Sequence, residues 1–455
     1  MDRKTEIDYT SLININKQNY NIGLAEYMMF LLACTLSVLM LFYMYIKAIF
    51  PYAPYLKDIL IILALAFAFL SIISNGYIIS KPNYLDKIIF ILFIYLLFQF
   101  IYTFSRTGSF AVTYYGFRLT FLPIFIYFLI KSIKNIKYQK KIDNIIITSI
   151  VIGCFITIIE SISLQLGIIS PETLAKILGR NAFFLDGFPW LRVYGVVGTP
   201  HITGVYNAIL FSMLFLSMEQ TTLNFYSLQI RPFIKYHLKS KRKFLLILSI
   251  AAVFLSTSRT AWTIVILLLL VYPFTKPKVN YLLIFKISSL VIFVLAILIY
   301  NLRDFLEASY LGFLIVYSSK FFIDMGINQL LIDNPIIGYG FEVGDYSALL
   351  DLSTISKENL TAGTELFIGQ LFRMLGAIGF GLYLFIFIII PLRILLKKNI
   401  PQRMKIIAAP TLVIGISFGH YNPFEGLPAA MCAWYFLALL SNEISFNNKL
   451  RFGKL

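Results

Sequence analysis

Residues 88–104 read IIFILFIYLLFQFIYTF, a run without a single charged residue. Comparable apolar runs recur along the chain, which has 455 residues, 59% of them hydrophobic and only 13% charged, and a mean hydropathy of +0.81. About a quarter of the residues in soluble domains are charged, so these charges are too few to cover a soluble protein of 52.2 kDa. The runs are continuous and rich in Leu, Ile and Phe, which predicts helices rather than the alternating strands of an outer-membrane barrel. The sequence therefore predicts an all-α, polytopic integral membrane protein.

The length and spacing of the apolar runs predict the number of spans. A helix needs about 20 mostly apolar residues to cross about 30 Å of hydrocarbon, and by this criterion the chain forms a single membrane domain over residues 1–455 with about twelve spans. The polar segment 1–23 does not resemble a cleavable signal peptide, so we expect the first span to remain as an anchor. We expect the spans near residues 24–46, 59–79, 88–104, 116–130, 145–168, 201–218, 244–257, 260–274, 281–300, 366–390, 406–420 and 427–441.

The charges predict the orientation of these spans. With a cytoplasmic N-terminus, most of the 39 Lys and Arg residues fall in segments assigned to the cytoplasm, and most acidic residues fall outside. The positive-inside rule favours this orientation, which places both termini in the cytoplasm. The basic clusters 131–141 and 231–243 fall inside, where they are typical of contact with anionic lipid. The net charge of +17 therefore indicates membrane lipid as a partner, and we expect no nucleic acid.

Metal and cofactor sites have no support in the sequence. Cys34, Cys154 and Cys432 each lie inside an apolar run, which favours packing over a disulfide or a metal cluster. The chain also has no GxxxxGK[ST] motif and no clustered Asp and His residues. We therefore expect no metal and no cofactor.

Two outer loops are long enough to build a site, residues 169–200 and residues 301–365. Long structured loops on a rigid scaffold are usually kept for binding. We expect loop 301–365 to fold over the outer mouth of the bundle as a partly helical cap. Within it, Asp333-Asn334-Pro335 and Gly338-Tyr339-Gly340 mark tight turns, and Tyr339 is a candidate substrate-binding residue.

Arginines are the strongest candidates for binding on the outer face. Arg192 begins RVYGVVGTPHITG, and Arg259 lies in STSRT, where one span turns directly into the next. A guanidinium group grips phosphate oxygens with two parallel hydrogen bonds, so converging arginines suit a pyrophosphate. Arg180 is the third candidate, although its position alone is that of an interfacial residue. Ordinary anchoring to lipid headgroups is the alternative for all three, and also for Arg106 and Arg118, which flank a short outer loop.

Two further charges fall within predicted spans. Glu160 lies near the outer end of the fifth span, and Arg373 lies about two turns into the tenth. A charge facing lipid is costly, so we expect both side chains to face the interior of the bundle. Arg373 is a second candidate substrate-binding residue.

Four motifs in the second half of the chain carry a family resemblance. They occur in the order RVYGVVGTPHITG (192–204), STSRT (256–260), DNPIIGYGF (333–341) and GTELFIGQLFRMLGAIGFGLY (363–383). Together they resemble the O-antigen ligase and polymerase superfamily, integral membrane enzymes that transfer or polymerise lipid-linked glycans. The resemblance covers about 200 residues, from Arg192 to Tyr383; elsewhere the match is in hydropathy and span number only.

The resemblance implies a glycosyltransferase that uses neither metal nor nucleotide sugar. Its expected substrate is a glycan on undecaprenyl pyrophosphate at the periplasmic face of a bacterial inner membrane. Arg192, Arg259 and Arg180 would bind the pyrophosphate leaving group, while a base deprotonates an acceptor hydroxyl. A polysaccharide chain-length regulator is a possible protein partner.

The fourth motif departs from the ligase pattern. Ligases of the superfamily usually carry a His-Asn pair ahead of the G-x-x-G glycines, and here Glu365 and Leu366 occupy those places. This favours polymerisation over ligation to lipid A core. Glu365 is a candidate base, or else an acid that complements the helix dipole. His420 is the second candidate base, and His201 is expected to line the pocket or to cap its helix.

Two alternatives remain open. The first is an O-antigen ligase, which performs the same chemistry on a different acceptor. The second is a flippase or another transporter, for which twelve spans are also typical. A transporter should show repeat symmetry and broken helices in matching halves, and the sequence has no such repeat.

Overall fold

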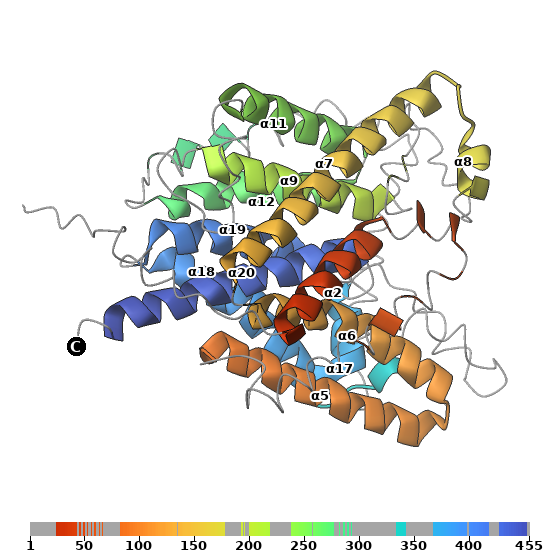
Figure 1. Cartoon of the computed structure of the whole chain (residues 1–455), viewed down its shortest axis with the longest axis vertical. Coiled ribbons are helices and arrows are strands. Elements are labelled where there is room, and N and C mark those ends of the chain that lie inside the picture. The colour runs from red at the N-terminus through yellow and green to blue at the C-terminus, as the bar shows by residue number, and fades with distance from the viewer. Residues whose placement is uncertain are drawn as a thin grey trace, which may run out of the picture.

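The computed structural model is a bundle of helices (Figure 1). All regular secondary structure in the described residues is helical, which confirms the predicted all-α fold. The described residues are 24–42, 45–46, 49–50, 52, 56, 59–60, 63, 66, 82–133, 135–177, 193, 195, 200–218, 238–256, 258–276, 282, 285–286, 289–290, 293, 334–342, 367–397, 400–417 and 427–452.

Helices lie over every predicted span except 59–79 and 281–300, where only scattered positions are described. A short helix also forms in segment 169–200, one 3-10 turn follows α12, and another begins within the DNPIIGYGF motif. The elements are α2 (Leu24–Leu41), α5 (Tyr84–Thr107), α6 (Phe110–Ser132), α7 (Ile136–Gln165), α8 (Pro171–Ile177), α9 (Pro200–Met218), α11 (Leu238–Leu255), α12 (Arg259–Val271), η2 (Tyr272–Thr275), η4 (Gly340–Glu342), α17 (Phe367–Leu384), the π-helix η6 (Phe385–Ile389), α18 (Ile390–Leu396), α19 (Gln402–Ser417) and α20 (Leu427–Phe452).

Three helical stretches of the described chain are long and apolar enough to cross a membrane. They cover Tyr84–Thr107, Lys137–Gln165 and Leu371–Leu396, the last made of parts of α17 and α18 joined by η6. These stretches indicate a protein associated with a membrane.

The exposed and buried faces of α5 and α7 differ in a way that fits lipid surroundings. Their exposed faces carry large apolar side chains at helical spacing, whereas polar and charged side chains are buried against the bundle. A soluble helix shows the opposite arrangement. The exposed positions include Phe90, Ile94, Leu97, Ile101 and Phe104 on α5 and Ile152, Phe155, Ile159 and Ile162 on α7; the buried polar positions include Asp86, Gln99 and Thr103 on α5 and Asp143, Ser149, Thr157, Glu160 and Ser161 on α7.

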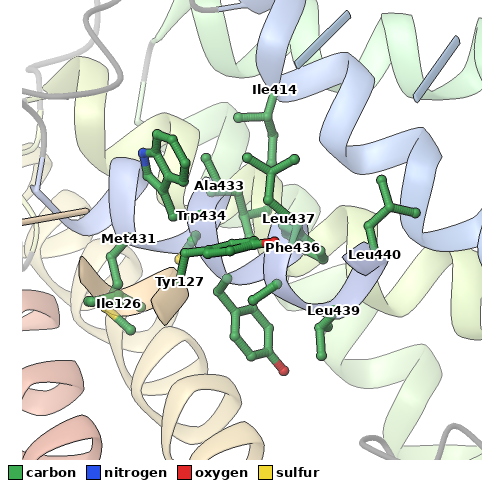
Figure 2. Close-up of a cluster of buried hydrophobic side chains, with 14 of the residues drawn as sticks. Ile126, Tyr127, Ile414, Met431, Ala433, Trp434, Phe436, Leu437, Leu439 and Leu440 are labelled. Atoms are coloured by element: carbon green, nitrogen blue, oxygen red, sulfur yellow. The ribbon is translucent and has the colours of Figure 1, made fainter. Parts of the chain in front are cut away.

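Helix α20 runs through the middle of the bundle and contacts α2, α6, α9 and α19 (Figure 1). Its Trp434 is fully buried and lies close to Tyr127 of α6 (Figure 2), with 6.4 Å between the ring centroids and the rings edge to face. Trp434 forms a second edge-to-face pair with Phe387 of η6, at 5.3 Å between centroids. Edge-to-face pairs of this kind add about 1 kcal/mol to the burial of the rings. The core is therefore centred on α20.

A buried polar group joins α5, α6 and α20 at one end of these helices. The Asp86 carboxylate accepts hydrogen bonds from the Tyr127 hydroxyl at 2.5 Å and the Ser441 hydroxyl at 2.7 Å, and it lies 3.4 Å from the Lys131 ammonium. Asn83 caps α5 through its side-chain oxygen and donates from its amide nitrogen to the Ser441 carbonyl at 2.8 Å. We call these five residues the polar node.

Helix α9 occupies a second central position, with α7, α11, α12, α19 and α20 around it. Its fully buried Asn207 donates to the Thr157 hydroxyl of α7 and to the Ala252 carbonyl of α11, both at 3.3 Å. An amide inside a bundle must find partners, and these two bonds connect three helices.

Candidate functional site

The DNPIIGYGF motif docks into a break in α17. Gly376 has φ 62° and ψ −170°, which interrupts the helix and leaves backbone groups without partners inside it. The loop supplies them: the Ala377 amide donates to the Pro335 carbonyl at 2.8 Å, and the Tyr339 amide donates to the Arg373 carbonyl at 2.8 Å. Two motifs of the family resemblance, the third and the fourth, are therefore one structural unit.

The loop approaches α17 closely because glycines face each other. A Cβ on Gly338 would meet the Gly376 nitrogen and the Arg373 carbonyl, and a Cβ on Gly376 would meet the backbone of Ile336 and Ile337. Gly338 and Gly376 both have positive φ. Only glycine combines this conformation with such an approach.

Side chains of α5 hold the other side of the loop. Tyr95 donates its hydroxyl to the Leu375 carbonyl at 2.6 Å, and the Gln99 amide donates to the Ile337 carbonyl at 2.7 Å. The Thr103 hydroxyl accepts a hydrogen bond from the Phe341 amide at 2.9 Å. The three side chains follow one another at i, i+4 and i+8, so they lie on one face of α5.

This docking places Tyr339 beside two arginines. The Arg373 guanidinium carbon lies 5.7 Å from the centre of the Tyr339 ring, and that of Arg106, at the end of α5, lies 5.4 Å from it. Arg106 also lies 5.6 Å from the ring of Tyr102. Arg373 is 9% exposed, whereas Tyr339 is half-buried and Arg106 is exposed. We call Arg106, Tyr339 and Arg373 the arginine–tyrosine group.

The first two motifs also pack on one another. Gly204, in the first turns of α9, lies against the turn between α11 and α12, where a Cβ on it would meet Ser256 and Ser258. Ser258 caps α12 by accepting from the Ala261 amide, so Arg259 is the first residue of that helix. The close contact brings the backbone of RVYGVVGTPHITG next to that of STSRT.

Glu160 fixes the segment that precedes α9. Its buried carboxylate accepts a hydrogen bond from the Gly195 amide at 2.9 Å, and Gly195 in turn packs on Thr203. The charge near the C-terminal end of α7 thus faces the interior of the bundle, as expected.

The predicted site residues are described to different extents. The structure buries Arg373, as expected, and also brings it next to Tyr339, a contact that the sequence did not predict. It places His201 and Arg259 in the first turns of α9 and α12, with their side chains outside the described part of the structure. Arg180, Arg192, Glu365 and His420 lie outside the described residues, as do 301–333 and 343–365 of the predicted cap.

Sequence reasoning missed the supporting role of α5. Tyr95, Gln99 and Thr103 are polar residues at four-residue spacing in an otherwise apolar helix, and that spacing was the available signal. Sequence reasoning also gave Arg106 an ordinary role in anchoring to lipid headgroups, whereas its described neighbours include Tyr102 and Tyr339.

The described residues contain no group of three or more His, Cys, Asp or Glu side chains that could hold a metal ion. Comparisons with known protein families, with curated proteins and with solved structures found no match to this chain.

Proposed function

We propose that this protein polymerises undecaprenyl-pyrophosphate-linked oligosaccharide repeat units at the periplasmic face of a bacterial inner membrane. The observation that carries the proposal is the pairwise packing of the four motifs. RVYGVVGTPHITG contacts STSRT through Gly204, and DNPIIGYGF docks into the broken α17. Segments far apart in the sequence that meet in this way are expected of one composite site rather than of separate loops.

The proposed topology has twelve spans with both termini in the cytoplasm. Contacts between helix ends support it, because each joins residues assigned to the same side. Arg403 pairs with Glu443 at 2.5 Å on the proposed cytoplasmic side, while the Gly195 amide binds Glu160 on the proposed periplasmic side. The Asn135 amide donates to Glu26 at 2.8 Å, again between residues assigned to the cytoplasmic side.

In the proposed reaction, a hydroxyl oxygen of the acceptor glycan attacks the anomeric carbon of the donor. A new glycosidic bond forms as the bond between that carbon and the pyrophosphate oxygen breaks. Glu365, or His420 in its place, takes the hydroxyl proton. Arg192, Arg259 and Arg180 neutralise the charge that develops on the leaving pyrophosphate, and His201 lines the pocket.

A reconstituted assay tests the proposal. The purified protein is reconstituted into sealed proteoliposomes and incubated with lipid-linked repeat units, without metal or nucleotide, and the products are separated by size. A ladder of longer glycans is expected. Transfer only to added lipid A core would identify a ligase, and movement of unmodified substrate across the bilayer would identify a transporter; either result would overturn the polymerase assignment.

Arg259→Ala is the corresponding site variant. Loss of one charge at the leaving group should lower turnover at least about a hundredfold, because such electrostatic stabilisation is worth about 3 kcal/mol in a water-poor site. Arg259→Lys should recover only part of the rate because it lacks the paired hydrogen bonds. Arg393 is an exposed arginine of α18, and Arg393→Ala is the matched control. Normal turnover by a folded, inserted Arg259→Ala protein would remove Arg259 from the proposed site.

A further inference from the structure

Arg373 is a buried cation whose described surroundings supply no anion. The side chain is 9% exposed, and it forms no ion pair with any residue that the structure describes; its charge faces the ring of Tyr339 at 5.7 Å. A face-on ring offsets only part of the cost of removing a guanidinium group from water. Such a group is stabilised most by an oxyanion, to which it can donate two hydrogen bonds at once.

A second positive charge is directed to the same ring. Arg106 lies 5.4 Å from the centre of the Tyr339 ring, but it approaches from α5, whereas Arg373 belongs to α17. Two guanidinium groups that share one ring repel each other, and an anion in contact with both converts that repulsion into attraction. The loop that carries Tyr339 is pinned by hydrogen bonds to both helices, so the arrangement is set by the fold.

The position of this group along α5 indicates where the anion comes from. Arg106 lies at the end of that helix and follows Phe98 and Tyr102 at four-residue spacing, and Phe98 belongs to the exposed apolar face, where it is 45% exposed. Phe110, at the start of α6, is 60% exposed. An apolar face that ends in arginine is typical of the boundary between lipid chains and headgroups.

We propose that Arg106, Tyr339 and Arg373 bind the phosphate group of a lipid whose chains lie along the exposed face of α5. The exposed Arg106 meets the phosphate first, and the buried Arg373 makes the contact that is specific to this site. The inference does not depend on glycosyl transfer, because it applies to any lipid that carries a phosphate at this depth.

The test measures binding of a defined lipid to the full-length chain. The protein is purified in a neutral detergent and titrated with short-chain phosphatidylglycerol, and bound lipid is counted by native mass spectrometry. Inorganic pyrophosphate is titrated in parallel to distinguish a lipid phosphate from a free one. We expect phosphatidylglycerol to bind at least about tenfold more tightly than pyrophosphate, because only the lipid also covers the apolar face.

Variants assign the binding to the proposed residues. Arg373→Gln should weaken phosphatidylglycerol binding about tenfold or more, and Arg373→Lys should weaken it less, because lysine keeps the charge and loses the paired hydrogen bonds. Arg393 is an exposed arginine of α18, and the Arg393→Gln variant should bind phosphatidylglycerol as tightly as the unmodified protein does. Arg106→Gln changes an exposed residue, so it carries the test if Arg373→Gln fails to fold.

Each result decides the proposal. The proposal would be overturned if the folded Arg373→Gln and Arg106→Gln variants bound phosphatidylglycerol as tightly as the unmodified protein does, or if the unmodified protein retained no phosphatidylglycerol. Equal affinity for pyrophosphate and phosphatidylglycerol would show a free-anion site and would overturn the lipid assignment. None of these outcomes depends on polymerase activity, so failure of the lipid site is distinct from failure of the proposed function.

Discussion

Gly376 shows how much of the site depends on single residues. Because it lacks a Cβ, the loop Asn334–Glu342 can lie directly on the α17 backbone and fill the helix break. Its backbone combines φ 62° with ψ −170°, a region that residues with side chains reach only at a cost. The docking that brings Tyr339 to Arg373 therefore depends on glycine at position 376.

Gly376→Ala should destabilise the protein. The backbone conformation costs alanine about 1–3 kcal/mol, and the new methyl group also forces the Ile336–Ile337 backbone away. Unfolding in mixed detergent micelles, followed by circular dichroism, measures the loss of stability.

Gly381→Ala is its matched control on the same helix. Nothing lies within 4 Å of a Cβ at Gly381, and alanine is the better helix former by about 1 kcal/mol. This variant should be as stable as the unmodified protein or slightly more so. Equal stability of the two variants would contradict the role assigned to Gly376 in the helix break.

Thr103→Ala should also weaken the docking of the loop. The Phe341 amide is buried with its residue and would lose the hydroxyl that accepts its hydrogen bond at 2.9 Å. A buried donor left without an acceptor costs about 1–3 kcal/mol. Thr103→Ser keeps the hydroxyl and should retain most of the stability, measured by the same unfolding experiment. If serine and alanine destabilise equally, the hydroxyl is not what holds the loop.

At the scale of the elements, the polar node makes three helices depend on one carboxylate. Asp86 of α5 binds Tyr127 of α6 and Ser441 of α20, and it lies beside Lys131 in a region where both side chains are almost fully buried. Breaking a buried charged pair by removing one partner is costly because the other charge stays behind.

Asp86→Asn should lower the free energy of unfolding by about 3 kcal/mol. Lys131→Met and the double variant complete a double-mutant cycle, in which the two changes should couple by at least about 1 kcal/mol. Denaturant unfolding of all four proteins gives the coupling energy. Strict additivity would show that the 3.4 Å contact between Asp86 and Lys131 does not contribute to stability.

Hydropathy predicts the helices well. In a continuous apolar run, the backbone N–H and C=O groups must bond to each other, and a helix satisfies this requirement. Hydropathy does not predict the break in α17. The residues around Gly376 have the apolar pattern of an ordinary helix. The conformation of Gly376 is instead set by a loop elsewhere in the sequence. Hydropathy does not predict the role of Arg106 for the same reason, because the Tyr339 ring that it contacts belongs to that loop.

At the scale of the whole molecule, the proposed topology places α8 on the opposite side of the membrane from the basic segment at the start of α7. Glu172 of α8 and Lys137 of α7 are both exposed, which makes them suitable reporters. In a background with Cys34, Cys154 and Cys432 replaced by alanine, Glu172→Cys should react with an impermeant maleimide in cells whose outer membrane is permeabilised. Lys137→Cys should react only after the inner membrane is opened as well.

Equal labelling of both positions from the same side would refute the orientation. Reversed labelling would do so too, and it would move the four motifs to the cytoplasmic face. The reporters are independent of the site, so the result bears on topology alone.

The contacts between α5 and the loop also govern the order in which the molecule is assembled. Gln99 and Tyr95 bond to partners that are 238 and 280 residues later in the chain. Until the ribosome has made those residues, the Gln99 amide and the Tyr95 hydroxyl of α5 lack the carbonyl groups to which they donate across the bundle. Polar groups in hydrocarbon favour helix association, so α5 joins its neighbours loosely at first and becomes fixed only when the loop and α17 emerge. A nascent chain truncated before residue 334 therefore lacks the partners of Tyr95 and Gln99, whereas one truncated after α18 contains them.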